Sequence, residues 1–267
     1  MRAVAFIAVF LLAACGKPPA TATDSPAIAA ADVAAGDPAE GLRVATRVGC
    51  NGCHAADGGG KVFDEDEDQG LVVTANLTIK RELYDDAAFA ALLREGRTHD
   101  GHVPWGMPIK MLQHLSDREV RDITAWMRSL PAVRPVGMPQ TKWSPSLAKA
   151  IADGTHPWLP DMKPDAGNKP PAMPPVEPLA LGRHLAMTSC GECHGWNLDG
   201  FEGDDAPSLV VAKAYTPEAF VRLMRTGVTA DGRESKTGLM SRMARDRFAP
   251  SLTDAEIAAL KQYLDSR

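Results

Sequence analysis

The sequence has few aromatic residues, no long apolar run in its folded part and no excess of positive charge. Aromatic side chains make up only 6% of the 267 residues, although 45% are hydrophobic, so little bulky material is available for a core. No apolar run of 18 or more residues follows the first 15, which argues against a membrane-spanning helix there. The formal net charge of −5 argues against nucleic acid as the main partner.

Cysteine is also scarce, and its five positions are informative. One residue, Cys15, stands alone near the start of the chain. The other four form two Cys-x-x-Cys pairs, Cys50 with Cys53 and Cys190 with Cys193. The count is odd, so the cysteines cannot all be paired as disulfides.

The N-terminus is typical of an export signal. A single positive charge, Arg2, precedes an apolar run over residues 3–14, which suits a signal-peptide core and is too short to span a bilayer. The run ends in the letters LAAC, which resemble the lipobox of bacterial lipoproteins. That resemblance implies a signal peptide over residues 1–14 and a diacylglyceryl group on Cys15, with Gly16 favouring the outer membrane. The alternative is a plain secretory signal with an incidental cysteine.

Proline divides the remainder of the chain. Residues 15–38 are poor in large apolar groups and are predicted to form a flexible tether. Twelve of the 21 prolines lie in residues 131–178, a predicted linker with one short helix near 146–152. Two blocks of similar size, 39–130 and 179–267, are left as candidate domains.

The two blocks are an internal repeat. Residues 88–101 match residues 219–232 at eight of 14 positions, and residues 115–120 match 252–257. The offset between matching segments varies (140, 131 and 137), so loops differ in length between the copies. The pattern therefore indicates a duplicated domain and not a short solenoid repeat.

Each copy is predicted to contain three main helices. The early helices are expected near 39–50 and 180–190, and the middle helices near 88–94 and 219–225. The closing helices begin at capping boxes, Ser116 with Glu119 and Thr253 with Glu256. No alternating strand pattern is evident, so we expect an all-α fold.

Each copy also contains a Cys-x-x-Cys-His run, ending in His54 and His194. This run is the attachment signature of a c-type haem. On a helical turn the two thiols share one face and can each bond a porphyrin vinyl group, and the histidine reaches the iron. Zinc is an alternative, but each pair would lack further thiolate ligands. A pair of disulfides would leave both histidines unexplained.

The second axial ligand to each iron is expected to be a methionine. Met107, in a Gly-Met-Pro stretch, is the candidate in the first copy, with Met111 as the runner-up. Met240 is favoured in the second copy over Met243, which could pack as core. Histidine and methionine ligation raises the reduction potential of a haem.

Both blocks resemble class I c-type cytochrome domains. The matching residues are the two Cys-x-x-Cys-His runs, Met107-Pro108, Met240 and the Leu-Ser-Asp or Leu-Thr-Asp turns before the closing helices. The resemblance implies two covalently bound haem c groups on Cys50, Cys53, Cys190 and Cys193, with iron held by His54, Met107, His194 and Met240. The second copy departs from the pattern, since Ser241 stands where proline follows the methionine.

Other polar features have no assigned role. The acidic run at residues 64–68 is expected to be a solvated loop, with a docking patch for a basic partner or a calcium loop as alternatives. The remaining histidines are expected mostly at the surface or in loops, and His99 and His102 lie close enough in sequence to Met107 to approach the first haem. They are His99, His102, His114, His156 and His184.

These features favour an electron carrier that faces the periplasm, anchored by lipid and exchanging single electrons with redox-protein partners. A dehydrogenase or respiratory donor would supply the electrons. The alternatives are a dihaem enzyme such as a peroxidase, with one open iron site, and a subunit with a mainly assembly role.

Overall fold

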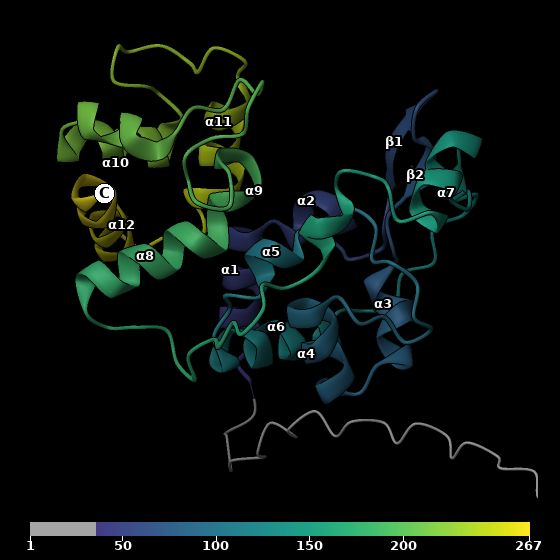
Figure 1. The fold of residues 1–267 in the computed structure, drawn as a ribbon. Coiled ribbons are helices and arrows are strands. Elements are labelled where there is room, and N and C mark those ends of the chain that lie inside the picture. Colours follow the sequence, from purple (N-terminus) through teal and green to yellow (C-terminus); the bar gives the residue numbers. More distant parts are fainter. Residues whose placement is uncertain (1–35) are drawn as a thin grey trace, which may run out of the picture. The chain divides into compact units, whose positions relative to one another are not determined.

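The computed structural model describes residues 36–267, and helices are the main regular structure in this part of the chain (Figure 1). The predicted signal peptide, Cys15 and most of the predicted tether lie outside the described residues. Within residues 36–267, no helix combines the length and apolar character needed to cross a bilayer. The expected helical fold is confirmed, with one small sheet in addition.

The helices of the first half surround one core. They are α1 (Pro38–Val48), α2 (Cys50–His54), α3 (Leu77–Lys80), η1 (Arg81–Leu83), α4 (Asp86–Glu95), α5 (Ile109–Leu112) and α6 (Asp117–Ser129). The long helices α1, α4 and α6 contribute Val44, Leu93 and Ile123 to this core. Apolar residues recur at helical spacing along these segments, so each helix buries one face.

The second half repeats this arrangement around its own core. Its elements are α8 (Pro178–Ser189), α9 (Gly191–His194), η3 (Leu209–Ala214), α10 (Pro217–Thr226), α11 (Leu239–Met243), η4 (Ala244–Phe248) and α12 (Asp254–Ser266). Helices α8, α10 and α12 contribute Leu185, Phe220 and Ile257. Element η4 is a single turn of π-helix.

The first and last helices of each half pack against each other, α1 on α6 and α8 on α12 (Figure 1). A glycine lies at each contact. A methyl group on Gly41 would lie 1.8 Å from the Asp122 carbonyl oxygen, and one on Gly182 would lie 2.0 Å from that of Ala259. No side chain fits at such distances, so glycine is required for the close approach of both helix pairs.

Both predicted capping boxes are present. The Ser116 hydroxyl accepts a hydrogen bond from the Glu119 backbone N–H (3.2 Å), and the Glu119 carboxylate accepts one from the Ser116 N–H (2.8 Å). Thr253 and Glu256 repeat these two bonds at 3.2 and 2.8 Å. The N-termini of α6 and α12 are thus fixed in the same way.

A three-stranded antiparallel sheet was not expected from the sequence. Its strands are β1 (Val62–Asp66), β2 (Gly70–Val73) and β3 (Lys142–Trp143), in that order. The acidic run at residues 64–68 therefore forms the end of strand β1 and the tight turn that follows it. Its side chains are mostly exposed, as expected of a solvated segment, but the prediction that the run is a loop was wrong for its first residues. Only Val72 in these strands is fully buried, so no alternating apolar pattern marks them.

The Pro-rich linker packs partly onto the first half. The helix expected near residues 146–152 is confirmed as α7 (Pro145–Ala152), and a 3₁₀ turn, η2 (Leu159–Met162), follows it. Trp105, two residues before Met107, lies against Trp143 and Trp158 of the linker, with ring centroids 5.9 Å apart in both cases. The linker thereby braces the segment that carries Met107.

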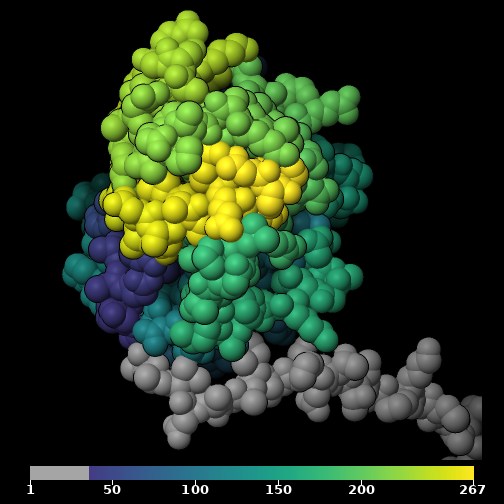
Figure 2. All heavy atoms as spheres, turned by 90° about the vertical axis from the view of Figure 1, so that its left-hand side faces the viewer, coloured from purple at the N-terminus to yellow at the C-terminus, as the bar shows by residue number. Residues whose placement is uncertain are grey.

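The two halves also touch each other directly. In the space-filling view, the purple residues near the start of the described chain adjoin the yellow residues of the C-terminal segment (Figure 2). Arg43 of α1 makes one of these contacts, since its guanidinium donates to the Ser251 carbonyl oxygen at 2.7 Å. The sequence repeat predicted two domains but gave no sign of this interface.

Candidate haem-binding sites

Each Cys-x-x-Cys-His run forms a short helix directly after the first long helix of its half. Gly49, at φ 90°, ends α1 and turns the chain into α2, which begins at Cys50. In the second half α8 ends at Ser189, and the chain continues through Cys190 into α9. Cysteines three residues apart on such a turn share one face, as attachment to two groups of one porphyrin requires.

All four cysteines of these runs are unpaired thiols in partly buried positions. Burial raises the pKa of Cys50 and of Cys190 to about 12, and burial also raises the pKa of Cys53 and of Cys193. These thiols are neutral at pH 7, whereas a reactive dithiol needs a thiolate. A thioether is uncharged and suits this environment.

The two histidines of the runs are held in the same orientation. His54 Nδ1 lies 2.8 Å from the Ala75 carbonyl oxygen, and His194 Nδ1 lies 2.7 Å from that of Pro207. A carbonyl oxygen only accepts, so Nδ1 carries the proton and Nε2 keeps its lone pair. Burial lowers the pKa of both rings and favours this neutral form, which suits metal ligation through Nε2.

A cavity of about 750 Å³ opens beside the second run. Its wall includes Cys190, Cys193, His194 and Met240. Apolar side chains line most of the remainder, among them Leu185, Leu209, Phe220, Leu223, Met224 and Leu264. Two thiols and an oriented imidazole on one wall of a largely apolar cavity fit a covalently attached haem.

The methionine candidates differ in their packing. Met111 is 0% exposed within the first core, whereas Met107 is partly buried at its edge. This arrangement favours Met107 for the role of ligand and Met111 for the role of core residue. Met240 and Met243 are both partly buried and both line the second cavity. The choice of Met240 over Met243 stays a prediction.

Three of the histidines outside the attachment runs contact nearby side chains, and a fourth, His114, is partly buried. The Tyr84 hydroxyl lies 3.2 Å from His99 Nδ1, and His102 pairs with Asp100. His156 packs against Trp105 with ring centroids 4.7 Å apart. Burial lowers the pKa of His114.

His184 is an exception to the expectation that most of these histidines lie at the surface or in loops. It lies in α8 with only 8% of its surface exposed. Its Nε2 is 2.8 and 3.0 Å from the two carboxylate oxygens of Glu119, in the other half of the chain.

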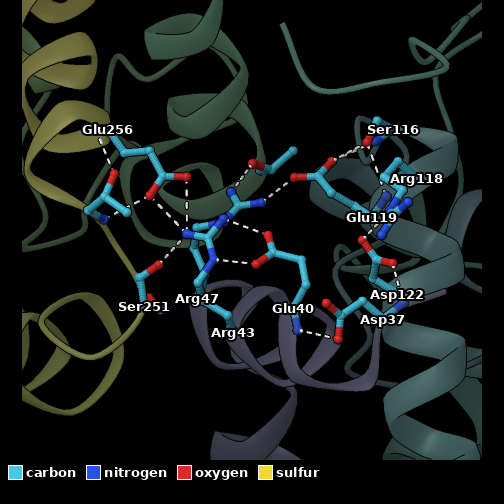
Figure 3. A network of polar contacts seen from close by, with 12 residues as sticks. Asp37, Glu40, Arg43, Arg47, Ser116, Arg118, Glu119, Asp122, Ser251 and Glu256 are labelled. Carbon is cyan, nitrogen blue, oxygen red and sulfur yellow. Dashed lines mark hydrogen bonds and ion pairs between the residues drawn. The ribbon is translucent and has the colours of Figure 1, made fainter. Parts of the chain in front are cut away.

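Glu119 is the centre of a buried polar group between the halves (Figure 3). Besides His184, it binds Arg47, whose Nη2 donates to its carboxylate at 2.5 Å. Arg47 also donates to the Thr188 hydroxyl at 2.6 Å. Burial alone would raise the pKa of Glu119, but Arg47 and His184 outweigh it and lower that pKa to about 2.

The two halves contribute corresponding residues to the interface, and each half binds the capping-box glutamate of the other. Arg43 lies two residues after Gly41, and His184 lies two residues after Gly182. Arg43 binds the capping-box glutamate of the second half, Glu256, at 2.8 Å, as His184 binds Glu119. The two halves therefore meet about an approximate two-fold relation, in which each early helix reaches the closing helix of the other copy.

These interface contacts were missed at the sequence level. Glu119 and Glu256 were recognised as capping residues, and a capping carboxylate gives no sign of a second partner. Both early helices carry several polar residues, so nothing in their sequences singles out Arg43 or His184 as an interface residue.

Within residues 36–267, no group of three or more histidine, cysteine, aspartate or glutamate side chains forms a site for a metal ion held by protein alone. A search of curated proteins found no significant match. The family model for cytochrome c matches the chain twice, over residues 38–131 and 179–267. Together with the two Cys-x-x-Cys-His helices, this double match shows that the chain belongs to the cytochrome c family, with two covalently bound haem c groups and a role in electron transfer.

Proposed function

We propose that the protein is a dihaem electron carrier that passes single electrons from a dehydrogenase or respiratory donor to a downstream acceptor. In this proposal it is not itself an enzyme, although it can serve as the electron-transfer subunit of an oxidoreductase complex. His54 and Met107 ligate one iron, and His194 and Met240 ligate the other. The donor and acceptor are redox proteins.

The observation that carries the proposal is the matched anchoring of the two histidines. Each ring is fixed by one carbonyl oxygen, that of Ala75 or that of Pro207, so each Nε2 is presented with no change of tautomer. When bound, a haem supplies a one-electron Fe(II)/Fe(III) couple. Ligands that are held rigidly in both oxidation states keep the reorganisation energy of electron transfer small.

A methionine on the second side supports a carrier over a peroxidase. Met107 lies at the edge of the first core, and Met240 lines the second cavity. A filled sixth position disfavours binding of oxygen or peroxide at the iron. A peroxidase needs one iron to be open.

Spectroscopy of the purified holoprotein tests this proposal. We expect two haems per chain and the weak methionine-to-iron charge-transfer band in the oxidised state. Met107→Ala should remove the contribution of one haem to this band, and Met111→Ala, the matched control, should leave it in place. A five-coordinate, high-spin haem in the wild-type protein would contradict the carrier proposal and support the peroxidase.

We further propose that the protein is exported and held in the bacterial cell envelope, facing the periplasm, by a lipid on Cys15. The support is the LAAC sequence at the end of the apolar N-terminal run. Two acyl chains suffice for stable anchoring, and Gly16 favours the outer membrane. Cys15→Ser should release the protein from membranes, and unchanged membrane retention would refute lipidation at this site.

A further inference from the structure

The second half contains an insertion that the first half lacks. Leu115 comes 14 positions after Gly101, whereas the equivalent Leu252 comes 20 positions after the equivalent Gly232. The longer segment contains the π-helical turn η4. Such turns are rare and frequently mark functional sites. This turn carries Arg247, which is only 9% exposed and has no counterpart in the first copy.

Arg247 reaches across the interface to the first haem-attachment run. Its Nε donates to the Arg47 carbonyl oxygen at 2.5 Å, near the end of α1. Its guanidinium also covers Gly49, since a methyl group there would lie 2.9 Å from Arg247 Cζ. Gly49 directly precedes Cys50, so the cation lies against the start of the first attachment helix.

The same side chain faces the second attachment run. Arg247 Nη1 lies 3.7 Å from a carboxylate oxygen of Glu192, which stands between Cys190 and Cys193. Arg247 is also one of the residues that line the second cavity.

The positive charge of Arg247 is only partly compensated. Its Nη2 is buried and has no hydrogen-bond partner among the described residues. Its acidic neighbour among the described residues, Glu192, has a side chain that is 39% exposed and lies beyond hydrogen-bond distance. By contrast, Arg47 is paired at 2.5 Å with a buried carboxylate. A buried charge with weak compensation acts strongly on nearby groups because little water screens it.

We propose that Arg247 is a shared tuning residue, a buried cation without a close ion pair that lies between the two attachment runs and raises the reduction potentials of both haems. Reduction adds one electron to each iron, converting Fe(III) to Fe(II), and a nearby positive charge stabilises the added electron. The inference deepens the proposed electron-transfer function and rests on it. It does not depend on which methionine ligates the second iron.

Potentiometric titration of the full-length holoprotein tests the inference, with dithionite as reductant, ferricyanide as oxidant and haem absorbance as the readout. Arg247→Gln should lower both midpoint potentials. Arg247→Lys keeps the positive charge, so both midpoint potentials should stay close to their wild-type values. Because the charge is buried, the shift should persist at high ionic strength. Unchanged potentials in Arg247→Gln with two haems attached would overturn the proposal, and movement of only one potential would overturn the shared role.

Two matched controls separate charge from structure. Arg43→Gln removes the same charge from the interface away from the attachment runs, where Arg43 holds Glu256 and Ser251. Arg245→Gln removes it from the exposed side of the same turn, where Arg245 pairs with Glu234. Both should leave the potentials in place. A shift in Arg43→Gln as large as that in Arg247→Gln would assign the effect to a loosened interface and overturn the proposal.

Glu192→Gln provides the opposite test if Arg247→Gln does not fold. It removes the partial compensation, so both potentials should rise. A fall or no change in Glu192→Gln would contradict the proposal. Failure of the electron-transfer function itself is distinguishable, because wild-type protein would then lack two haems or show no reversible reduction.

Discussion

The two halves of the chain share the helices that surround each attachment run and differ in the segments between them. Both have a glycine-mediated helix contact and a capping box at the closing helix. Among the residues described, only the first half contributes strands to a sheet, which the linker completes with β3, and only the second half carries the π-helical turn. Packing around a haem thus constrains the framework, whereas the connecting segments are free to acquire contacts with the other half.

Removal of one haem should produce the largest difference between the halves. Replacement of Cys190 and Cys193 by alanine should lower the haem content, measured as the pyridine haemochrome, from two per chain to one. The cavity of about 750 Å³ would lose its contents, and an empty apolar cavity of that size is incompatible with close packing. We therefore expect the helices of the second half to lose cooperative unfolding in circular dichroism.

The matched double variant at Cys50 and Cys53 should empty the first half in the same way. If either double variant keeps two haems, the assignment of attachment residues is wrong.

The two capping glutamates provide the next comparison. Glu119 is buried and binds Arg47 and His184, whereas Glu256 is more exposed and binds Arg43. Glu119→Gln leaves Arg47 buried without its ion pair and should lower the free energy of unfolding by about 3–5 kcal/mol. Glu256→Gln should cost only about 1 kcal/mol. Chemical denaturation measures both, and equal losses would contradict the asymmetry of the interface.

Acid should selectively weaken the same contact. The pKa of Glu119 falls from an ordinary 4.5 to about 2 in the folded chain, so its ionised form stabilises the fold above pH 4.5. This contribution, about 3 kcal/mol, is lost as the pH falls from 4.5 towards 2. The difference in unfolding free energy between wild type and Glu119→Gln should shrink over this range. A difference independent of pH would show that the charge of Glu119 is unimportant.

The glycine contacts should give effects that are smaller than that of Glu119→Gln and nearly equal in the two halves. Gly41→Ala and Gly182→Ala each place a methyl group within about 2 Å of a backbone oxygen. Forced separation of the helices should lower the free energy of unfolding by about 1–3 kcal/mol in each case. Gly137→Ala is the control, because a methyl group there meets open space. It measures the effect of replacing a glycine without steric crowding, including the strain that the positive φ of Gly137 adds. A loss of stability in only one of the two variants, Gly41→Ala or Gly182→Ala, would show that the two helix contacts are not equivalent.

The sequence predicted the parts of the fold that depend on local pattern. The capping boxes, the repeated helices and the short α7 follow from residue spacing, and the attachment runs follow from a motif with a defined chemistry. The double family match supports the haem content that this motif implied. These features need only residues close together along the chain.

The parts that were missed depend on contacts between distant residues. Strand β3 pairs with β2 across about 70 residues of chain, and neither strand has an alternating face that would reveal it. His184 and Glu119 are 65 residues apart, and nothing local to either identifies the other. The π-helical turn was visible only as a change in repeat offset, which shows an insertion but not its conformation.

The approximate two-fold pairing of the halves has a consequence for assembly. Two separate copies would have to find each other at their cellular concentration, whereas copies in one chain meet at the high effective concentration set by their linker. Fusion also removes the requirement of symmetric dimers that every contact occur twice. A tandem chain can therefore keep one buried arginine without a close ion pair, Arg247, at its centre, where identical subunits would bring two such charges together.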